Sequence, residues 1–387
     1  MSEFVQLHLL TSYPPSNLNR DDLGRPKTAI MGGVNRLRIS SQSLKRAWRT
    51  SEVFEEALGD WKGIRTKQFG NEIKKMLLEQ SVQEKNAQKW ASEIAACFGK
   101  LKKVKKGEPE SLEIEQLAHI SPEEKMRVEA LVKILAEENR EPDKNELKLL
   151  RKTPKAVDIA LFGRMLASDP AYNVEAAAQV AHAITVHPVK VDDDYFTAVD
   201  DLNTFEEDAG AAHIGEATFG AGVFYLYICI NRDLLLENLQ GDKSLARKTL
   251  EALVETAARV SPAGKQNSFA SRAYTSYMLA EKGSQQPRSL SVAFLKPIIS
   301  HDQLSDAIKV LEKQKDNFDK IYGSCSESSE KFNVLTGQGT LPWPLGGNRL
   351  WERQGTAPRI HHALPCWVCW LQLLASNAQT LSQISKR

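Results

Sequence analysis

The sequence contains no long hydrophobic run and no cysteine framework, and both absences exclude whole classes of protein. No stretch of its 387 residues approaches the roughly 18 consecutive apolar residues that cross a membrane, so no membrane partner is expected. The N-terminus has neither the basic segment nor the apolar core of a secretory signal. Five cysteines, an odd number at scattered positions, do not form the pattern of a disulfide-stabilised secreted domain. We therefore expect a cytoplasmic protein with reduced thiols.

The chain also has little net charge, so a segment in which positive charge is concentrated differs clearly from the remainder of the sequence. Its formal net charge is only +2. Between residues 19 and 49, eight basic residues accompany two acidic ones, a local net charge of +6 that leaves −4 for the remainder. Such a segment on a nearly neutral protein predicts a polyanion bound at one place, with nucleic acid as the first candidate. The basic residues are Arg20, Arg25, Lys27, Arg36, Arg38, Lys45, Arg46 and Arg49.

The order of apolar segments predicts an α+β fold. Apolar runs rich in β-branched and aromatic residues predict strands, and amphipathic periodicity predicts helices. Their order is strand, helix, strand, strand, helix, strand, which is that of a ferredoxin-like or RNA-recognition-type sandwich with large insertions. We expect strands at 4–10, 37–39, 184–187, 222–230 and 289–298, and helices at 40–58, 173–183, 243–259 and 302–320.

The basic segment has the residue types that phosphate recognition requires. Arginine supplies a planar fork, lysine a point charge, and the start of a helix adds backbone amides. A helix capped at Ser40 or Ser41 would place Lys45 and Arg49 one turn apart on one face. Gln42 and Ser43 can bond phosphate or ribose 2′-hydroxyl oxygens.

Two glycines in the same segment, Gly32 and Gly33, allow the backbone to approach a ligand closely. The alternative interpretation of the whole segment is a solvated helix face whose lysines and arginines serve solubility. Runs of charge are common, and the segment is neither a Walker loop nor an RNP motif. The residue types alone leave both interpretations open.

The same segment resembles the N-terminal signature of a known family. Its pattern NRDD…AI.GG..R.RISSQSLKRA.R is similar to that of the CasC family, the repeated backbone subunit of the type I-E CRISPR Cascade complex within the RAMP superfamily. Further blocks follow in the same order, so that the resemblance runs from residue 3 to about residue 300. They are VDIALFGRM at 157–165, AHAIT at 181–185, DYFTAVDDL at 194–202, GVFY at 222–225 and PAGKQ at 262–266.

The resemblance implies a fold like a right hand, with a modified RNA-recognition-motif palm, a helical finger insert and a thumb hairpin. On that pattern the palm comprises 1–59, 156–183 and 223–322, the finger 60–155 and the thumb 184–222. Residues 323–387 form an atypical tail that becomes rich in Gly, Pro and Trp after Asn333. An unrelated extension and a shifted reading frame would both explain this tail.

In function, the resemblance implies a non-catalytic subunit that needs no cofactor and binds guide (CRISPR) RNA. Several copies would line up along one guide, contact other Cascade subunits and present the guide for pairing with target DNA. Each thumb would reach across the neighbouring copy's RNA and displace one nucleotide at regular intervals. Sequence recognition would then be delegated to the guide, while the protein reads the RNA backbone.

The family motif also assigns RNA contacts residue by residue. Met165 would pack against a guide base, and Tyr195, Phe196 and Thr197 would form the thumb tip. Tyr195 stands where the family more usually has Trp, and a smaller aromatic ring still stacks on a base, at about 1–3 kcal/mol. Without the surrounding block, this aromatic pair would be interpreted as core. The remaining guide-RNA contacts are assigned to Arg20, Lys27, Gln42, Ser43, Lys45, Arg46 and Arg49.

Two basic runs of the finger are candidates for contact with target DNA. The resemblance implies that finger lysines face incoming DNA, with strongly salt-dependent contacts. The alternative is a solvated, salt-bridged helix face, because several glutamates lie nearby. On a helix the second run would share one face, and it comprises Lys144, Lys148, Arg151, Lys152 and Lys155. The first run comprises Lys100, Lys102, Lys103, Lys105 and Lys106.

Two other functions remain open from the residues. Some RAMP relatives cleave RNA, and histidines or an acidic cluster could supply that chemistry. The residues concerned are His182, His187 and His213, and Asp192, Asp193, Asp194, Asp200 and Asp201. A lone single-stranded RNA-binding module is the second possibility, and it would need no neighbouring copy.

The tail contains one pattern that could suggest a metal site. A Cys-x-x-Cys pair, Cys366 and Cys369, follows the adjacent His361 and His362. Zinc requires four well-spaced ligands, and adjacent histidines with tryptophans around the cysteines fit that requirement poorly. No metal is therefore expected.

Overall fold

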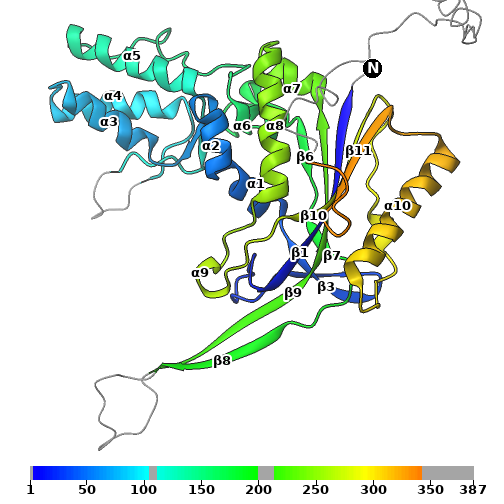
Figure 1. Ribbon diagram of the computed structural model, residues 1–387. Helices are drawn as coiled ribbons and strands as arrows, with labels where there is room; N and C mark the ends of the chain where they lie inside the picture. The colour runs from blue at the N-terminus through cyan, green and yellow to red at the C-terminus, as the bar shows by residue number, and fades with distance from the viewer. Residues whose placement is uncertain (1–2, 104–110, 199–212, 342–387) are drawn as a thin grey trace, which may run out of the picture. The chain divides into compact units, whose positions relative to one another are not determined.

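An antiparallel sheet forms the centre of the computed structural model, which describes residues 3–103, 111–198 and 213–341 (Figure 1). Within these residues the strands follow the order β11-β10-β1-β9-β7-β3-β2, and β6 and β8 also pair with β9. The predicted α+β class is confirmed. The strands are β1 (Phe4–Ser16), β2 (Thr28–Met31), β3 (Val34–Ile39), β6 (Ala178–Val180), β7 (Ala183–Thr185), β8 (Asp192–Ala198), β9 (His213–Asn231), β10 (Thr275–Gly283) and β11 (Ser328–Asn333).

Helices cover both faces of the central strands, which explains why β1 is buried without a break from Val5 to Thr11. Leu10 packs with Phe294 and Leu311 on the side of helix α10. Leu7 and Leu9 are also fully buried, and strand alternation places them on the opposite face, where helix α8 lies (Figure 1). The helices outside the subdomain described below are α1 (Ser41–Arg49), α2 (Glu52–Leu58), α6 (Val157–Phe162), α7 (Arg232–Asn238), α8 (Lys243–Arg259), α9 (Gln266–Phe269) and α10 (Gln303–Tyr322), with short 3-10 turns η1 (Gly59–Trp61), η2 (Pro170–Tyr172) and η3 (Ser291–Phe294).

The predicted strand at 289–298 is wrong, and the strand that pairs with β1 on the side away from β9 is Thr275–Gly283. The later segment contains η3, and its apolar side chains Leu290 and Phe294 are buried beneath the sheet instead of within it. The true strand has weak β-type composition because it ends in two buried charges. Glu281 is neutralised by Arg288 at 2.7 Å, and Lys282 lies 3.1 Å from the carboxylate of Glu3. Sequence patterns do not reveal such tertiary pairing.

The predicted small-residue helix at 173–183 is also wrong, because strands β6 and β7 occupy this segment. Ala178 lies opposite Ile230 of β9. The amide of Ala177 bonds to the carbonyl of Ala160 at 3.1 Å. Small side chains here permit close packing between α6 and the sheet. Composition alone does not distinguish small residues needed for such packing from small residues that favour a helix.

A helical subdomain with its own core lies between α2 and α6 in the chain. Its core includes Phe69, Ile73, Trp90, Ile94 and Leu131. Within the described residues, neither this subdomain nor the rest of the chain contains a helix long and apolar enough to cross a membrane. The subdomain comprises α3 (Phe69–Glu79), α4 (Glu84–Ala96) and α5 (Pro122–Glu138), with a two-stranded sheet of β4 (Ile64–Thr66) and β5 (Ala118–Ile120).

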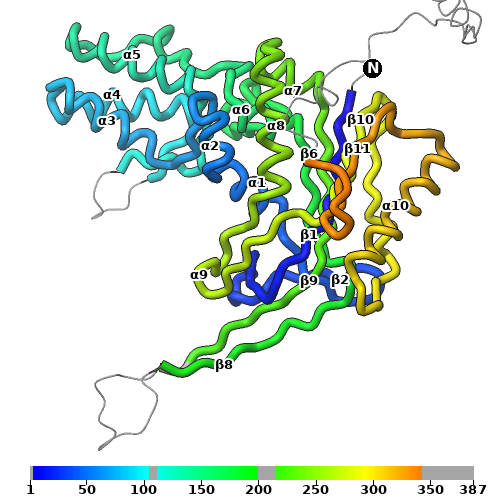
Figure 2. Tube along the Cα trace, in the orientation of Figure 1, coloured from blue at the N-terminus to red at the C-terminus, as the bar shows by residue number. Residues whose placement is uncertain are grey.

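A two-stranded ribbon runs out from the sheet, and Figure 2 traces its course. The 19-residue strand β9 pairs with β8 over its first part and with β1 over its later part. The side chains of β8 are exposed along the whole strand. The predicted thumb therefore includes a hairpin ribbon, and its connecting residues 199–212 lie outside the described chain.

Candidate nucleic-acid interface

Helix α1 begins where the sequence predicts and exposes one polar face. The Ser40 side chain accepts a hydrogen bond from the Ser43 amide at 3.3 Å, which is N-cap geometry. The amide of Ser40 in turn bonds to the Asn19 side chain at 2.8 Å, so the preceding loop fixes the start of the helix. One face of α1 is buried through Leu44 and Trp48. The opposite face exposes Gln42 and Arg46 and partly exposes Ser43 and Lys45.

The side chain of Lys45 is half-buried against an aromatic ring. Its Nζ lies 5.6 Å from the centroid of Phe162, at the end of α6, in a cation–π contact. Burial lowers the pKa of Lys45. A partly desolvated cation held in this way interacts more strongly with an approaching anion than a fully hydrated one.

The structure places Arg49 differently from the prediction, which assigned it to the RNA-binding face with Lys45. Its guanidinium lies 2.5 Å from the carboxylate of buried Asp158 and donates to the carbonyl of Gly63 at 2.7 Å. Asp158 also accepts hydrogen bonds from the Gly63 amide and from His119, both at 2.8 Å. Burial alone would raise the pKa of Asp158, but the hydrogen bond and charge of His119, the charge of Arg49 and the Gly63 amide hold it below its ordinary value. Arg49 thus fastens α1 to α6 and to the base of the helical subdomain.

A second basic residue of the segment, Arg36, is wholly buried. It donates to the carbonyls of Met31, Thr185 and Phe294 at 3.2, 2.8 and 2.9 Å. Burial lowers its pKa. The local charge of the sequence therefore overstates the charge at the surface, because Arg36 and Arg49 are both used inside the protein.

The Gly32-Gly33 pair also has an internal role. Both glycines have positive φ, 62° and 76°, and form the two-residue turn between β2 and β3. A Cβ added to Gly32 would lie 1.8 Å from the carbonyl oxygen of Leu295. The close approach that Gly32 permits is therefore made to Leu295, the residue directly after η3 of the same chain.

A second group of cations lies beside the start of α1. The guanidinium of Arg38 lies 2.7 Å from Nδ1 of the exposed His182. Burial, and then the charges of Arg38 and Lys27, lower the pKa of His182, so its Nδ1 accepts the hydrogen bond. From the sequence, His182 was a candidate only for catalysis, and Arg38 was not among the residues expected to contact RNA. Within the described residues, no acidic side chain pairs with Arg20, Lys27, Arg38, Lys45 or Arg46.

A cleft of about 290 Å³ lies at the base of the ribbon. Arg20, Arg25 and Lys265 line it together with the acidic side chains of Asp193 and Glu216. Arg25 lies 3.1 Å from Asp193, so the loop before β2 is tied to β8. Lys265 was not among the residues expected to contact RNA, although it belongs to the PAGKQ block that carries the family resemblance.

The ribbon exposes the three residues assigned to the thumb tip. Tyr195 is 65% exposed and Phe196 is 44% exposed. Thr197 is exposed as well and shares a face with Tyr195 by strand alternation. Phe196 lies opposite Gly215, where an added Cβ would come within 2.2 Å of the aromatic ring. The glycine thus leaves room for the ring to lie across the ribbon.

Met165 is 81% exposed, at the start of a loop that follows α6. The preceding residue, Arg164, is buried and forms an ion pair with buried Glu124 at 2.8 Å. The ion pair of Arg164 therefore fixes the backbone next to Met165, whose apolar, polarisable side chain is exposed to solvent.

The second basic run of the finger does not share a helix face, so that prediction is wrong. Helix α5 ends at Glu138 and is followed by Asn139 with a left-handed φ of 47°, and residues 140–156 form turns and irregular structure. Arg151 pairs with Glu123 at 3.0 Å, and Lys155 pairs with Asp242 at 2.9 Å. The remaining three, Lys144, Lys148 and Lys152, are exposed.

In the first basic run, two lysines are paired with glutamates. Lys100 lies 3.2 Å from Glu115, and Lys102 lies 3.6 Å from Glu113. Lys103 is exposed. Lys105 and Lys106 lie outside the described residues.

The structure shows the surroundings of some of the residues that were candidates for catalysis or metal binding. His187 is buried, and its Nε2 accepts from the Val223 amide at 3.1 Å. Over residues 3–103, 111–198 and 213–341, no group of three or more potential ligands could hold a metal ion. The tail residues His361, His362, Cys366 and Cys369, the thumb residues Asp200 and Asp201 and the side chain of His213 fall outside the described part of the chain.

Comparisons with known proteins give two kinds of match. A model of the CT1975-like protein family matches residues 5–342. A chain from a structure described as "CRISPR RNA-guided surveillance complex, pre-nicking" has 32% sequence identity and a TM-score of 0.76, over 86% of this chain and 92% of that chain. A chain from a "CRISPR RNA-guided surveillance complex" has 27% identity and a TM-score of 0.65, over 85% of this chain and 90% of that chain. No curated protein matches the sequence.

Proposed function

Because the chain belongs to the CT1975-like family, we propose that it is a non-catalytic, guide-RNA-binding backbone subunit of a Cascade surveillance complex. The resemblance to Cascade backbone subunits is confirmed by the family match and by similarity to chains of two CRISPR RNA-guided surveillance complexes. In this role, copies of the chain assemble side by side on one guide RNA in the cytoplasm. They contact the other Cascade subunits and present the guide for pairing with target DNA.

The observation that carries this proposal is a group of cations without acidic partners around the start of α1. We call the surface formed by Arg20, Lys27, Arg38, Lys45 and Arg46 the α1 face. Because no described acid neutralises these side chains, their charge is available to successive phosphates. Gln42, exposed on the same helix, adds a neutral group for phosphate or ribose oxygens. Such a surface binds the backbone and leaves base edges free for pairing.

The exposed ribbon supports a partner outside the chain. An isolated two-stranded ribbon is only marginally stable in water, and β8 exposes every side chain. Aromatic side chains on such a ribbon gain most from stacking on bases. In our proposal the ribbon of one copy crosses the RNA bound on the next copy, where Tyr195 and Phe196 contact bases.

A palm of the RNA-recognition type is part of the proposal. Read along the chain, β1, α1–α2, β7, β9, α8 and β10 follow the order strand, helix, strand, strand, helix, strand. In space, β10, β1, β9 and β7 are neighbours in one sheet. Both features support this palm, with the helical subdomain as the finger.

Charge reversal on the α1 face tests the proposal. We expect Lys45→Glu combined with Arg46→Glu to abolish assembly on a full-length guide, measured by the RNA that copurifies with the complex and by its mass. Lys313→Glu combined with Lys320→Glu, on exposed positions of α10, is the matched control and should assemble normally. Assembly of the α1 double variant at the normal mass would show that another face binds the guide.

The absence of catalysis is tested on the same preparation. Labelled guide and complementary RNA are incubated with the purified complex and divalent metal ions. We expect binding without cleavage. Cuts that disappear when Asp192, Asp193 and Asp194 are replaced by Ala would identify an RNA-cleaving enzyme instead.

A further inference from the structure

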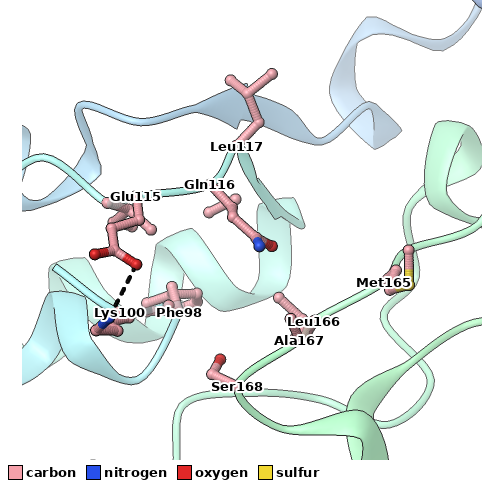
Figure 3. A pocket seen from close by; sticks show the side chains of 12 residues that line it. Phe98, Lys100, Glu115, Gln116, Leu117, Met165, Leu166, Ala167 and Ser168 are labelled. Atoms are coloured by element: carbon pink, nitrogen blue, oxygen red, sulfur yellow. Dashed lines mark ion pairs between the residues drawn. The ribbon is translucent and has the colours of Figure 1, made fainter. Parts of the chain in front are cut away.

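The helical subdomain has a hydrophobic core of its own, so contacts at its junction with the rest of the chain must set its angle to the central sheet. The buried side chains of that core all come from residues 69–149. A pocket of about 220 Å³ lies between the subdomain and the loop that follows α6 (Figure 3). Phe98 and Leu117 line it from the subdomain, and Met165 to Ser168 line it from the loop. Apolar packing is interrupted here, so directional polar bonds are needed to fix the angle.

The carboxylate of Asp158 on α6 accepts bonds from several elements that meet at this junction. It is fully buried. Its Oδ1 accepts from the amides of Gly63 and Ile159 at 2.8 and 3.1 Å. Its Oδ2 accepts from Nε of Arg49 at 2.5 Å and from Nε2 of His119 at 2.8 Å. Four donors occupy all the acceptor positions of the carboxylate. A single buried charge therefore joins α1, the entry into the subdomain and strand β5.

Within the subdomain, this connection passes through His119. Its ring lies against Gly63, where an added Cβ would come within 3.1 Å of Nε2. Glycine at this position therefore leaves room for the ring beside Asp158. The carbonyl of His119 accepts a hydrogen bond from Arg164 at 3.4 Å, and Arg164 is also paired with Glu124 of α5 at 2.8 Å. The side chain and the backbone of His119 are thus bonded to residues near the two ends of α6.

The connection also reaches the α1 face. Arg49 lies one turn after Lys45 and Arg46 on the same helix. Beyond the junction, the subdomain exposes Lys144 and Lys148, and no acid among the described residues pairs with either. In copies repeated along one guide, a fixed angle gives these lysines the same position relative to every α1 face. A loosely attached subdomain would have to be ordered whenever its lysines bind, which lowers affinity.

We infer that Asp158 and His119 are positioning residues that hold the helical subdomain at one angle to the guide-binding helix. The lysines to which the resemblance assigns DNA contact are then already oriented when DNA arrives. The inference rests on the proposed function, from which it takes the guide on the α1 face. It adds that two nucleic-acid-binding surfaces of one copy are coupled by a buried carboxylate and an imidazole that touch neither nucleic acid.

The angle can be measured directly by energy transfer between two dyes in single molecules. The dyes are attached to non-natural amino acids at Gln83 of the subdomain and Lys248 of α8, which are both exposed. We expect one narrow distribution of transfer efficiency for the wild type, with or without guide RNA. His119→Leu, which removes the donor to Asp158, should broaden it, whereas His119→Gln keeps an N–H donor and should preserve it. Gly63→Ala displaces the ring without changing any charge and should also broaden the distribution.

DNA binding separates positioning from simple stabilisation. The probe is a labelled duplex DNA unrelated to the guide, so that base pairing does not contribute to its affinity. Assembled on guide RNA, His119→Leu should keep the wild-type number of copies per guide. It should bind the duplex roughly tenfold more weakly than the wild type, within the range of coupling between two sites, while His119→Gln stays within about twofold. A lower melting temperature of His119→Leu with unchanged transfer efficiency and DNA affinity would overturn the inference.

A measurement on the wild type alone also decides the matter, even if the variants fail to fold. A broad or multiple distribution of transfer efficiency in the wild type would show that the junction does not fix the angle, and would refute the inference while the proposed function stands. Failure of the proposed function is seen separately, as wild-type protein that does not assemble on guide RNA. That result would remove the basis of the inference as well.

Discussion

At the scale of single residues, neighbouring arginines of one segment serve different purposes. Arg46 is exposed and has no acidic partner among the described residues, whereas Arg49 is bonded to the buried carboxylate of Asp158. A free guanidinium offers its charge to a ligand. One that is bonded to a buried carboxylate stabilises the fold, because its removal leaves a desolvated charge uncompensated.

We expect Arg49→Ala and Arg46→Ala to have opposite consequences. Arg49→Ala should lower the free energy of unfolding by about 3 kcal/mol, the cost of breaking the buried ion pair with Asp158. Arg46→Ala should change it by less than about 0.5 kcal/mol, as an exposed substitution does. It should instead weaken guide binding. Urea unfolding and RNA-binding titrations of both variants measure these effects. An equal loss of stability in the two variants would contradict a structural role for Arg49 and a binding role for Arg46.

A buried polar network beneath α10 provides a second residue-scale effect. His8 lies 2.9 Å from the Tyr225 hydroxyl and 3.2 Å from Glu281. Burial lowers the pKa of His8. For Glu281, burial opposes ionisation, but hydrogen bonds from His8 and Arg288 outweigh it and lower the pKa to about 2. Both folded-state pKa values therefore lie below those of the unfolded chain.

The sign of these shifts predicts loss of stability in acid. A group with a lowered folded-state pKa binds protons more readily when unfolded, so its contribution is complete above the unfolded pKa and falls with pH. For His8 the loss begins near the unfolded value of 6.5, and for Glu281 it extends from 4.5 to about 2. As the pH is lowered from 4.5 to about 2, the free energy of unfolding of Glu281→Gln should fall less steeply than that of the wild type. Parallel wild-type and variant curves over that window, followed by circular dichroism, would refute the assignment.

At the scale of elements, the ribbon of β8 and β9 depends on a glycine for its shape. Gly215 leaves space for the Phe196 ring, which an added Cβ would approach to 2.2 Å. The ribbon is exposed, so moving this ring costs little folding energy. It would, however, change the aromatic surface offered to RNA.

We expect Gly215→Val to impair assembly while the melting temperature changes by no more than about 2 °C. The valine displaces Phe196 from the ribbon surface, and only contacts outside the chain depend on that position. Thr218→Val, a nearly isosteric change on the same strand, serves as control. Calorimetry measures stability, and mass photometry counts copies bound per guide. A normal number of Gly215→Val copies per guide would show that Phe196 does not contact RNA bases from the ribbon.

At the scale of the whole molecule, the chain combines a near-neutral total charge with one positive face. A net charge of +2 gives little general attraction for nucleic acid. The α1 face concentrates five cations that no described acid neutralises. Binding should therefore depend on this face and on salt, because each neutralised phosphate releases counterions.

The salt dependence of guide binding gives a quantitative check. For single-stranded RNA, the logarithm of the affinity falls with the logarithm of salt concentration at about 0.7 per neutralised phosphate, so five contacts predict a slope of about −3.5 per copy. Arg46→Ala should reduce the steepness by about 0.7. Fluorescence anisotropy between low and physiological salt measures both slopes. An unchanged slope in Arg46→Ala would exclude this side chain from phosphate contact.

Local sequence was sufficient for features that depend on near neighbours. Ser40 caps α1 because its hydroxyl reaches an amide three residues away. The apolar period that buries Leu44 and Trp48 is equally local. The strand that opens the chain, helix α8, helix α10 and the family resemblance carried by the segment from residue 19 to residue 49 could likewise be predicted from the sequence, whereas the strand expected at 289–298 and the helix expected at 173–183 were misplaced.

Tertiary structure decided which charges are used inside the protein and which remain on its surface. Arg36 and Arg49 look like surface cations in the sequence, yet carbonyls and a carboxylate from distant segments enclose them. The buried charges of Glu281 and Lys282 concealed strand β10 for the same reason. Composition records how many charges a chain has, but the cost of burying each one depends on partners that only folding brings together.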